Sequence, residues 1–176
     1  SGQTPDGTAQ RSVTNERLVA DPCRLQASNA ERYKAVALSS EPEVGETLGA
    51  DIAKTQRQYD ALIDTLARRL AGTADEERLA QVNTQAQAFH QARAALVQAR
   101  DFGLTQRIRE VYETQFLPAS QGLLKALDAL TQSQRQSIDA AALRVAHWSW
   151  QARLALVAFG ALSLVLGTLL ALWLVR

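Results

Sequence analysis

The last stretch of the chain constrains its fold most, because it stays apolar over a length that spans a bilayer. From Leu154 to Val175 the sequence reads LALVAFGALSLVLGTLLALWLV, 22 positions without a charged residue, between Arg153 and Arg176. A helix of that length extends about 33 Å, which exceeds the roughly 30 Å hydrocarbon core of a bilayer. A core helix of a soluble protein seldom stays apolar on every face for so many turns. Residues 151–176 are therefore predicted to form a transmembrane helix.

Tryptophans stand near both ends of this apolar stretch. Trp148 and Trp150 precede it, and Trp173 lies close to its other end. Tryptophan is enriched where a spanning helix meets the two membrane–water interfaces. The preceding residues are thus expected to form a domain that this helix tethers to the membrane.

Residues 1–153 have the size and composition of one water-soluble domain. Of the 19 basic residues, Arg176 lies outside this part, so 18 remain against 18 acidic residues and the domain is formally neutral. A nucleic-acid partner is not expected, because a phosphate backbone would require a basic stripe.

The residues that carry chemistry are sparse. Cys23 is the only cysteine, and His90 and His147 are the only histidines, so the sequence predicts no disulfide and no metal-ligand cluster. The spacing reveals no nucleophile–base pair, phosphate-binding loop or carboxylate pair. We therefore expect neither an enzyme nor a cofactor.

The N-terminal third predicts a linker and one long helix. Residues 1–7 have the composition of a linker, and a helical pattern follows from about Thr8 to Ser40. Pro22 interrupts this pattern and is expected to kink the helix, although Asp21 and Pro22 also suit the start of a helix. The segment EPEVG at residues 41–45 is the first clear break.

Apolar residues at three- and four-residue steps then predict two further helices. The second runs from about Leu48 to Leu70, and the third from about Leu79 to Val97. Thr73 or Asp75 is expected to cap the third helix, since hydroxyl and carboxylate side chains accept from the first backbone N–H groups. A turn at residues 101–103 ends it.

No break follows Leu104, so a fourth helix is expected to continue through Trp148 into the bilayer, with Pro118 as its only kink. No strand pattern is visible. Four long helices with short connections predict an all-α, antiparallel up-down four-helix bundle over residues 8–150.

This topology also predicts what lies upstream. In an antiparallel four-helix bundle, the first and last residues lie at the same end. The last residue is at the membrane, and the chain starts with SGQTPDG rather than Met. We therefore expect a first transmembrane helix just before Ser1.

Several segments, in this order along the chain, are similar to one family. They are NERLVAD at 15–21, FHQARAALVQARDFG at 89–103, PASQG at 118–122, AHW at 146–148 and ALWLVR at 171–176. With the membrane-anchored bundle, they resemble the bacterial chemoreceptors, or methyl-accepting chemotaxis proteins, whose periplasmic ligand-binding domain is a four-helix bundle.

The resemblance implies a homodimer in the bacterial inner membrane with its bundle in the periplasm. Such a receptor binds a small organic acid or amino acid. It passes a small displacement of the fourth helix and second transmembrane helix to a cytoplasmic signalling part, which engages cytoplasmic signalling proteins.

The resemblance also implies site residues, at the dimer interface of the aspartate-sensing members of the family. Arg24 and Ser28 match two first-helix positions there, and Arg32 falls within one residue of a third. Asn29 stands where those receptors have an arginine, so one carboxylate partner is missing. The fourth-helix candidates are Tyr112, Gln115, Phe116 and Ser120.

The spacing of the first-helix residues is independent of any resemblance. Arg24, Ser28 and Arg32 recur every four residues and share one helix face. The guanidinium fork suits a carboxylate because it donates two parallel hydrogen bonds. The alternative is a solvated face with salt bridges, for example to Glu31.

A second arrangement lies within one subunit. Arg93 and Arg100 are seven residues apart on the third helix, and Tyr59 and Thr114 are available on neighbouring helices. They form an alternative pocket for a dicarboxylate, although arginines at a bundle edge also extend to solvent for purely structural reasons.

Two other functions remain open. A transmembrane histidine kinase can use the same bundle as its sensor, and only cytoplasmic sequence would separate the two. A structural membrane-anchored helical protein would bind no small molecule.

Overall fold

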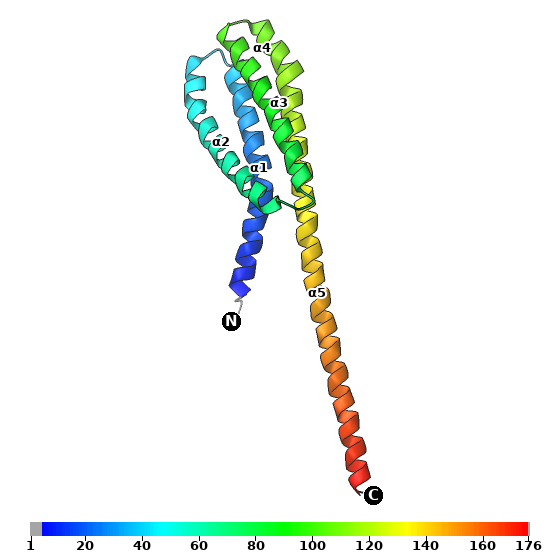
Figure 1. Ribbon diagram of the computed structural model, residues 1–176. Helices are drawn as coiled ribbons and strands as arrows, with labels where there is room; N and C mark the ends of the chain where they lie inside the picture. Colours follow the sequence, from blue (N-terminus) through cyan, green and yellow to red (C-terminus); the bar gives the residue numbers. More distant parts are fainter. Residues whose placement is uncertain (1–4, 176) are drawn as a thin grey trace. The chain divides into compact units, whose positions relative to one another are not determined.

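The computed structural model describes the backbone of residues 5–175, and the side chains of residues 17–18, 20–140, 143–144, 148 and 150–168. All regular secondary structure in residues 5–175 is helical, as the sequence predicts. The elements are α1 (Pro5–Leu38), α2 (Pro42–Leu70), α3 (Glu76–Asp101), α4 (Thr105–Val111), a π-helical turn η1 (Tyr112–Phe116) and α5 (Leu117–Val175) (Figure 1). The chain divides into two compact units, Ser1–Arg135 and Gln136–Arg176.

The first helix starts earlier than the sequence suggests. α1 begins at Pro5, so residues 5–7 of the predicted linker are helical, whereas residues 1–4 lie outside the described part. A proline suits this position because its fixed φ matches a helical first turn and its missing N–H would have no helical partner. Pro22 lies inside α1 and is buried, so the helix passes through this proline rather than starting at it.

The connection between α2 and α3 differs from the expected capping. Thr73 donates its hydroxyl hydrogen to the carbonyl oxygen of Leu70 at 2.7 Å, so this side chain closes α2 instead of capping α3. Asp75 is the N-cap residue of α3, as one of the two alternatives predicted, but its side chain makes no capping hydrogen bond. Gly72 has φ of 75°, a left-handed conformation that favours glycine.

The Asp75 carboxylate instead ties this connection to α5. Ser133 donates to Oδ1 at 2.7 Å, Arg78 donates to the same oxygen at 3.0 Å, and Gln134 donates to Oδ2. Burial by itself raises the pKa of Asp75. The three hydrogen bonds and the Arg78 charge outweigh burial and hold that pKa below its ordinary value.

The predicted fourth helix is not one regular α-helix. α4 and α5 are separated by the π-helical turn Tyr112–Phe116, in which the N–H of Leu117 bonds to the carbonyl of Tyr112, five residues back. The sequence places the only disturbance at Pro118, the second residue of α5. A proline ring crowds the carbonyl four residues earlier, here Thr114, and a wider turn relieves that crowding.

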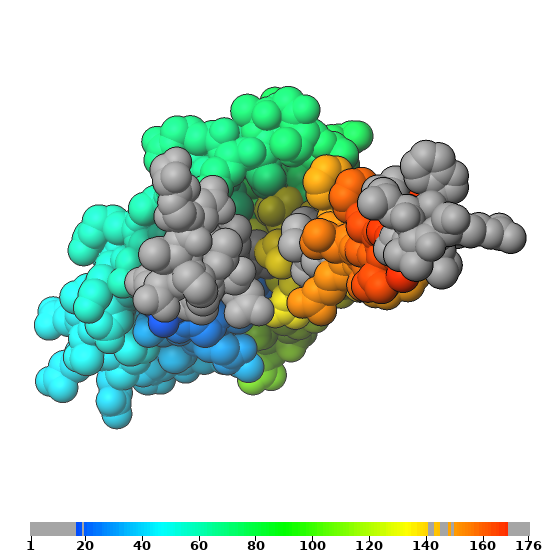
Figure 2. Space-filling model, turned by 90° about the horizontal axis from the view of Figure 1, so that it is seen from below, coloured from blue at the N-terminus to red at the C-terminus, as the bar shows by residue number. Residues whose placement is uncertain are grey.

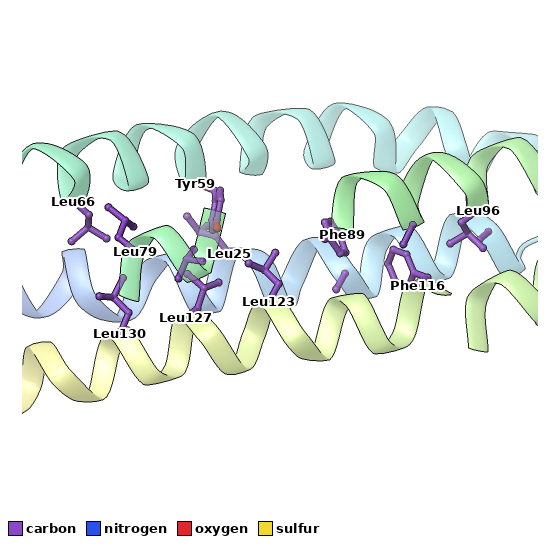
Figure 3. Close-up of a cluster of buried hydrophobic side chains, with 14 of the residues drawn as sticks. Leu25, Tyr59, Leu66, Leu79, Phe89, Leu96, Phe116, Leu123, Leu127 and Leu130 are labelled. Carbon is purple, nitrogen blue, oxygen red and sulfur yellow. The ribbon is translucent and has the colours of Figure 1, made fainter. Parts of the chain in front are cut away.

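The core of the first unit draws apolar side chains from α1, α2, α3, α4, η1 and α5. Figure 3 shows them pointing toward one another between the ribbons. The most deeply buried of the large apolar side chains are Val82, Phe89, Leu96, Val111, Phe116, Leu123 and Leu127. Full burial of one such side chain contributes about 1.5–3 kcal/mol.

The second unit contains a candidate membrane span. Among the described residues, the segment Trp150–Thr168, with a mean hydropathy of 1.5, is long and apolar enough to cross a membrane. Its large side chains are exposed, with Leu156 at 74% and Phe159 at 73% (orange to red in Figure 2). Trp148 and Trp150 are exposed as well. The side chain of Trp173 lies outside the described residues.

Candidate functional site

The π-helical turn η1 carries four of the residues predicted for the two alternative sites. Phe116 is only 2% exposed and stacks on Tyr112, with ring centroids 5.7 Å apart. Gln115 and Thr114 are exposed, and the Thr114 hydroxyl donates to the Glu110 carbonyl at 2.7 Å. π-Helical turns often occur at functional sites, because they redirect side chains relative to a regular helix.

Phe116 belongs to an aromatic cluster formed by Tyr33, Phe89, Tyr112 and Phe116. The Phe89 and Phe116 centroids are 5.3 Å apart, and Tyr33 lies edge-on to both at 6.1 and 6.4 Å (Figure 3 labels the two phenylalanines). These residues come from α1, α3 and η1, so the cluster links three elements. Edge-to-face pairs of this kind contribute about 0.5–1.5 kcal/mol beyond their buried area.

Two cations lie against this cluster. Arg93 on α3 donates from Nη1 to the Tyr33 hydroxyl at 2.9 Å, and its guanidinium carbon lies 5.3 Å from the centre of the Tyr33 ring. The Lys34 ammonium lies 5.9 Å from the centre of the Tyr112 ring. Among the described residues, the Arg93 side chain makes no other hydrogen bond and no ion pair, so most of its donors remain available to a ligand carboxylate.

His90 lies beside Arg93 on α3. Burial lowers the pKa of His90, and the positive charge of Arg93 lowers it further, against a smaller opposing effect of Asp60. Both effects favour the neutral form of His90, and Arg93 supplies a positive charge at this edge of the cluster.

A second group of polar side chains lies between α1 and α2; we call it the α1–α2 polar seam. It consists of Asn29 and Arg32 on α1 and Thr55 on α2. Asn29, 1% exposed, donates from Nδ2 to the Ile52 carbonyl at 3.1 Å. Arg32 donates from Nη1 to Oδ1 of Asn29 at 3.1 Å and to Oγ1 of Thr55 at 2.7 Å.

The two helices also bury polar groups without partners. Gln26 Nε2 and the Tyr59 hydroxyl make no hydrogen bond in the described part of the chain. Burial raises the pKa of Tyr59, and the nearby charge of Asp60 raises it further, so this hydroxyl stays protonated. An unsatisfied buried polar group costs about 1–3 kcal/mol.

The structure separates the predicted first-helix residues. Arg24 is largely exposed and pairs with Asp21 at 3.3 Å. This is the solvated face with a salt bridge that the sequence offered as the alternative to a ligand site, although the partner is Asp21 and not Glu31. Ser28 and Arg32 are half-buried, and Asn29 is fully buried. Arg24, Ser28 and Arg32 thus keep some access to solvent, while Asn29 supports Arg32 from inside.

The fourth-helix candidates divide in the same way. Tyr112 is half-buried and Gln115 is exposed, but Phe116 and Ser120 are buried, Ser120 at 5% exposure. The buried pair can reach a ligand only through other side chains. Sequence reasoning missed Tyr33 and Lys34, which connect α1 to this region; the only sequence signal for them is their position directly after Arg32.

The alternative pocket is also divided. Arg93 bonds to Tyr33 rather than to Tyr59 or Thr114. Arg100 packs its guanidinium on Gly45, where a Cβ would lie 3.0 Å from Nη1. In the described residues no hydrogen bond joins any two of Arg93, Arg100, Tyr59 and Thr114.

Comparison with known proteins gives no identification: no family model matches the chain, and no curated protein matches it.

Proposed function

We propose that this chain is the extracytoplasmic ligand-sensing part of a transmembrane chemoreceptor, without enzymatic activity of its own. The observation that carries the proposal is the course of α5. This helix begins directly after η1, which contributes Tyr112 and Phe116 to the aromatic cluster. Phe116 lies against Tyr33, whose hydroxyl accepts from Arg93, and α5 includes the candidate span Trp150–Thr168. α5 therefore continues in sequence from the turn that carries part of the aromatic cluster to the candidate membrane span.

The proposed architecture is an antiparallel up-down four-helix bundle whose last helix continues into the membrane. Short connections at residues 39–41, 71–75 and 102–104 support it, because such connections join antiparallel neighbours. The common core of α1, α2, α3 and α5 side chains supports it as well. In the proposed setting, the bundle stands in the periplasm and the helix crosses the bacterial inner membrane.

The proposed ligand is a small organic acid or amino acid. Arginine is the side chain best suited to a carboxylate, since it donates two parallel hydrogen bonds to it. In the first arrangement, Arg24, Ser28 and Arg32 of a homodimer face the ligand together with Gln115. In the second, Arg93 binds it within one subunit, beside Tyr33 and Tyr112.

Ligand contacts at η1 would bias the position of α5. A shift of about 1–2 Å is within the range of known switching helices, and a hydrogen-bonded helix resists compression along its axis. The π-helical turn suits such a role because it interrupts the regular ladder at the point where the shift begins.

A ligand screen on the full chain in lipid nanodiscs tests the proposal. Organic acids and amino acids are added one at a time, and the unfolding midpoint of the chain is measured. A specific ligand at 100 times its Kd stabilises the folded state by about 2.7 kcal/mol. Sedimentation at several protein concentrations shows whether the ligand also strengthens a dimer.

Variants decide between the two arrangements. Arg24→Gln with Arg32→Gln should weaken binding at a dimer face, whereas Arg93→Gln should weaken binding within one subunit. Arg68→Gln is the control, because Arg68 is exposed on α2 and pairs with Asp64. A screen in which no acid or amino acid raises the midpoint would favour the structural membrane-anchored protein instead.

A further inference from the structure

A cavity of about 570 Å³ lies at the end of the first unit where two connections meet; we call it the loop-end cavity. Its lining comes from the end of α1, the α1–α2 connection, the end of α3 and the beginning of α4. Figure 1 shows the α1–α2 and α3–α4 connections at the same end of this unit. Its volume is within the range of about 300–1,000 Å³ found for small-molecule sites.

Among the described residues, the charged side chains that line the loop-end cavity are Arg100 and Arg109, and no carboxylate of that part lines it. Neither arginine makes an ion pair or a side-chain hydrogen bond in the described part of the chain. Arg107, two residues before Arg109 and outside the lining, does pair with Glu110 at 3.3 Å. The cavity thus holds two positive charges without a partner in the described residues.

Three hydroxyl groups accompany the arginines. Ser40 and Thr105 make no side-chain hydrogen bond among the described residues. Ser39 accepts a hydrogen bond of 3.1 Å from the Glu41 N–H and keeps its own hydrogen for donation. All three can therefore donate to an anionic oxygen.

The position of Arg100 depends on the absence of a side chain at Gly45. A Cβ at that residue would lie 3.0 Å from Nη1 and 3.1 Å from Nη2 of Arg100. Real Cβ contacts are rarely this short, so the bare α2 backbone provides the room in which the guanidinium lies. Gly49, about one turn further along α2, has no atom within 4 Å of the equivalent position.

The rest of the lining is apolar and includes Leu38, Pro42 and Ile108. An apolar wall suits a carbon skeleton and offers nothing to the hydration shell of an inorganic ion. We infer that the loop-end cavity binds a small organic dicarboxylate, whose carboxylates pair with Arg100 and Arg109 and whose carbon chain contacts the apolar wall. Its role as a signal rests on the proposed sensing function, but the binding itself does not.

Calorimetry with the full chain in lipid nanodiscs tests the inference, with succinate as the probe. Succinate should bind, and its uncharged diamide should not. Arg100→Gln and Arg109→Gln should each lower the affinity by about tenfold or more, as expected for loss of a charge-assisted pair. Arg107→Gln is the matched control and should leave the affinity unchanged.

A second pair of variants removes no charge. Gly45→Ala should displace the Arg100 guanidinium and weaken succinate binding several-fold. Gly49→Ala should not affect binding. Alanine favours a helix over glycine by up to about 1 kcal/mol, and this effect is shared by the two variants. Weaker binding in Gly45→Ala alone, at an unfolding midpoint equal to that of Gly49→Ala, therefore reflects the contact with Arg100.

The possible results divide clearly. Weaker binding in both arginine variants and in Gly45→Ala, with the two controls unchanged, supports the inference. Absence of succinate binding at millimolar concentration, equal binding of inorganic phosphate, or full affinity in both arginine variants overturns it. Loss of binding only in Arg32→Gln or Arg93→Gln overturns the loop-end site while supporting the proposed sensing function.

Discussion

Nη1 of Arg32 on α1 donates a hydrogen bond of 2.7 Å to Oγ1 of Thr55 on α2. The same nitrogen lies 3.1 Å from Oδ1 of Asn29. Arg32 therefore joins two helices of the first unit, whatever it binds in addition. Arg24, on the same face of α1, makes its one side-chain hydrogen bond among the described residues to Asp21.

Arg32→Ala should reduce the free energy of unfolding by about 1–3 kcal/mol, because it leaves the buried Asn29 oxygen without its donor. Arg24→Ala should change it by less than about 0.5 kcal/mol, since its ion pair is exposed. Thermal and urea unfolding of the full chain in detergent measure both. Equal effects of the two substitutions would show that the α1–α2 polar seam does not stabilise the fold.

Phe116→Ala should destabilise the first unit by about 3–5 kcal/mol, the usual cost of emptying a buried phenylalanine site. Gln115→Ala, at the neighbouring exposed position, should cost less than about 0.5 kcal/mol. Circular dichroism during urea unfolding separates them. A small cost at Phe116 would mean that this ring is available for ligand contact rather than committed to the core.

Acid should weaken the fold through Asp75. The folded-state pKa of this carboxyl is below its ordinary value, so its stabilising contribution is fully present above about pH 5. The contribution falls as the pH drops through the ordinary value near 4 toward the folded-state pKa. Asp75→Asn should therefore lower the unfolding midpoint at pH 7 and lower it progressively less toward pH 3.

Glu77→Gln is the control for this pH experiment. Glu77 lies in the first turn of α3 close to Asp75, but it is exposed and makes no side-chain hydrogen bond among the described residues. The unfolding midpoint of Glu77→Gln should equal that of the chain without substitutions across the pH range. If Asp75→Asn follows it equally closely, the Ser133, Gln134 and Arg78 contacts do not hold the ionised carboxylate.

Leu162→Arg should impair membrane insertion. An arginine near the centre of a spanning helix costs about 2.5–3.5 kcal/mol, whereas one near the end reaches the interface with its long side chain. Leu154→Arg, beside Arg153, should therefore have a much smaller effect. The fraction of chain that resists alkaline extraction from membranes measures both. Full extraction of the chain without either substitution would contradict the proposed transmembrane helix.

The sequence predicts the helices of the first unit because their apolar residues follow the helical period. Val82, Phe89 and Leu96 on α3 come seven residues apart, and all three are buried. The sequence also predicts the connections between these helices. Pro42 lies in the first turn of α2, and Gly103, with φ of 69°, lies in the turn after α3. Such local signals act through propensities that need no tertiary partner.

Tertiary contacts decided what local patterns could not. Asp75 has the sequence position of a helix cap. Its carboxylate accepts hydrogen bonds from Ser133 and Gln134, which lie far along the chain, and not from the backbone N–H groups of α3. The π-helical turn also depends partly on residues distant in sequence, because its Phe116 packs against Phe89 and Tyr33 from other helices. A pattern of residues along one helix carries no information about which partner a side chain meets.

The candidate site illustrates the same division. Spacing alone places Arg24 and Arg32 on one helix face, and it treats Arg93 and Arg100 as a pair. In three dimensions Arg32 binds Thr55, Arg93 binds Tyr33, and Arg100 turns to the bare backbone at Gly45. An arginine side chain is long and carries several rotatable bonds, so its charge ends where neighbouring helices offer an acceptor, a ring or an open space.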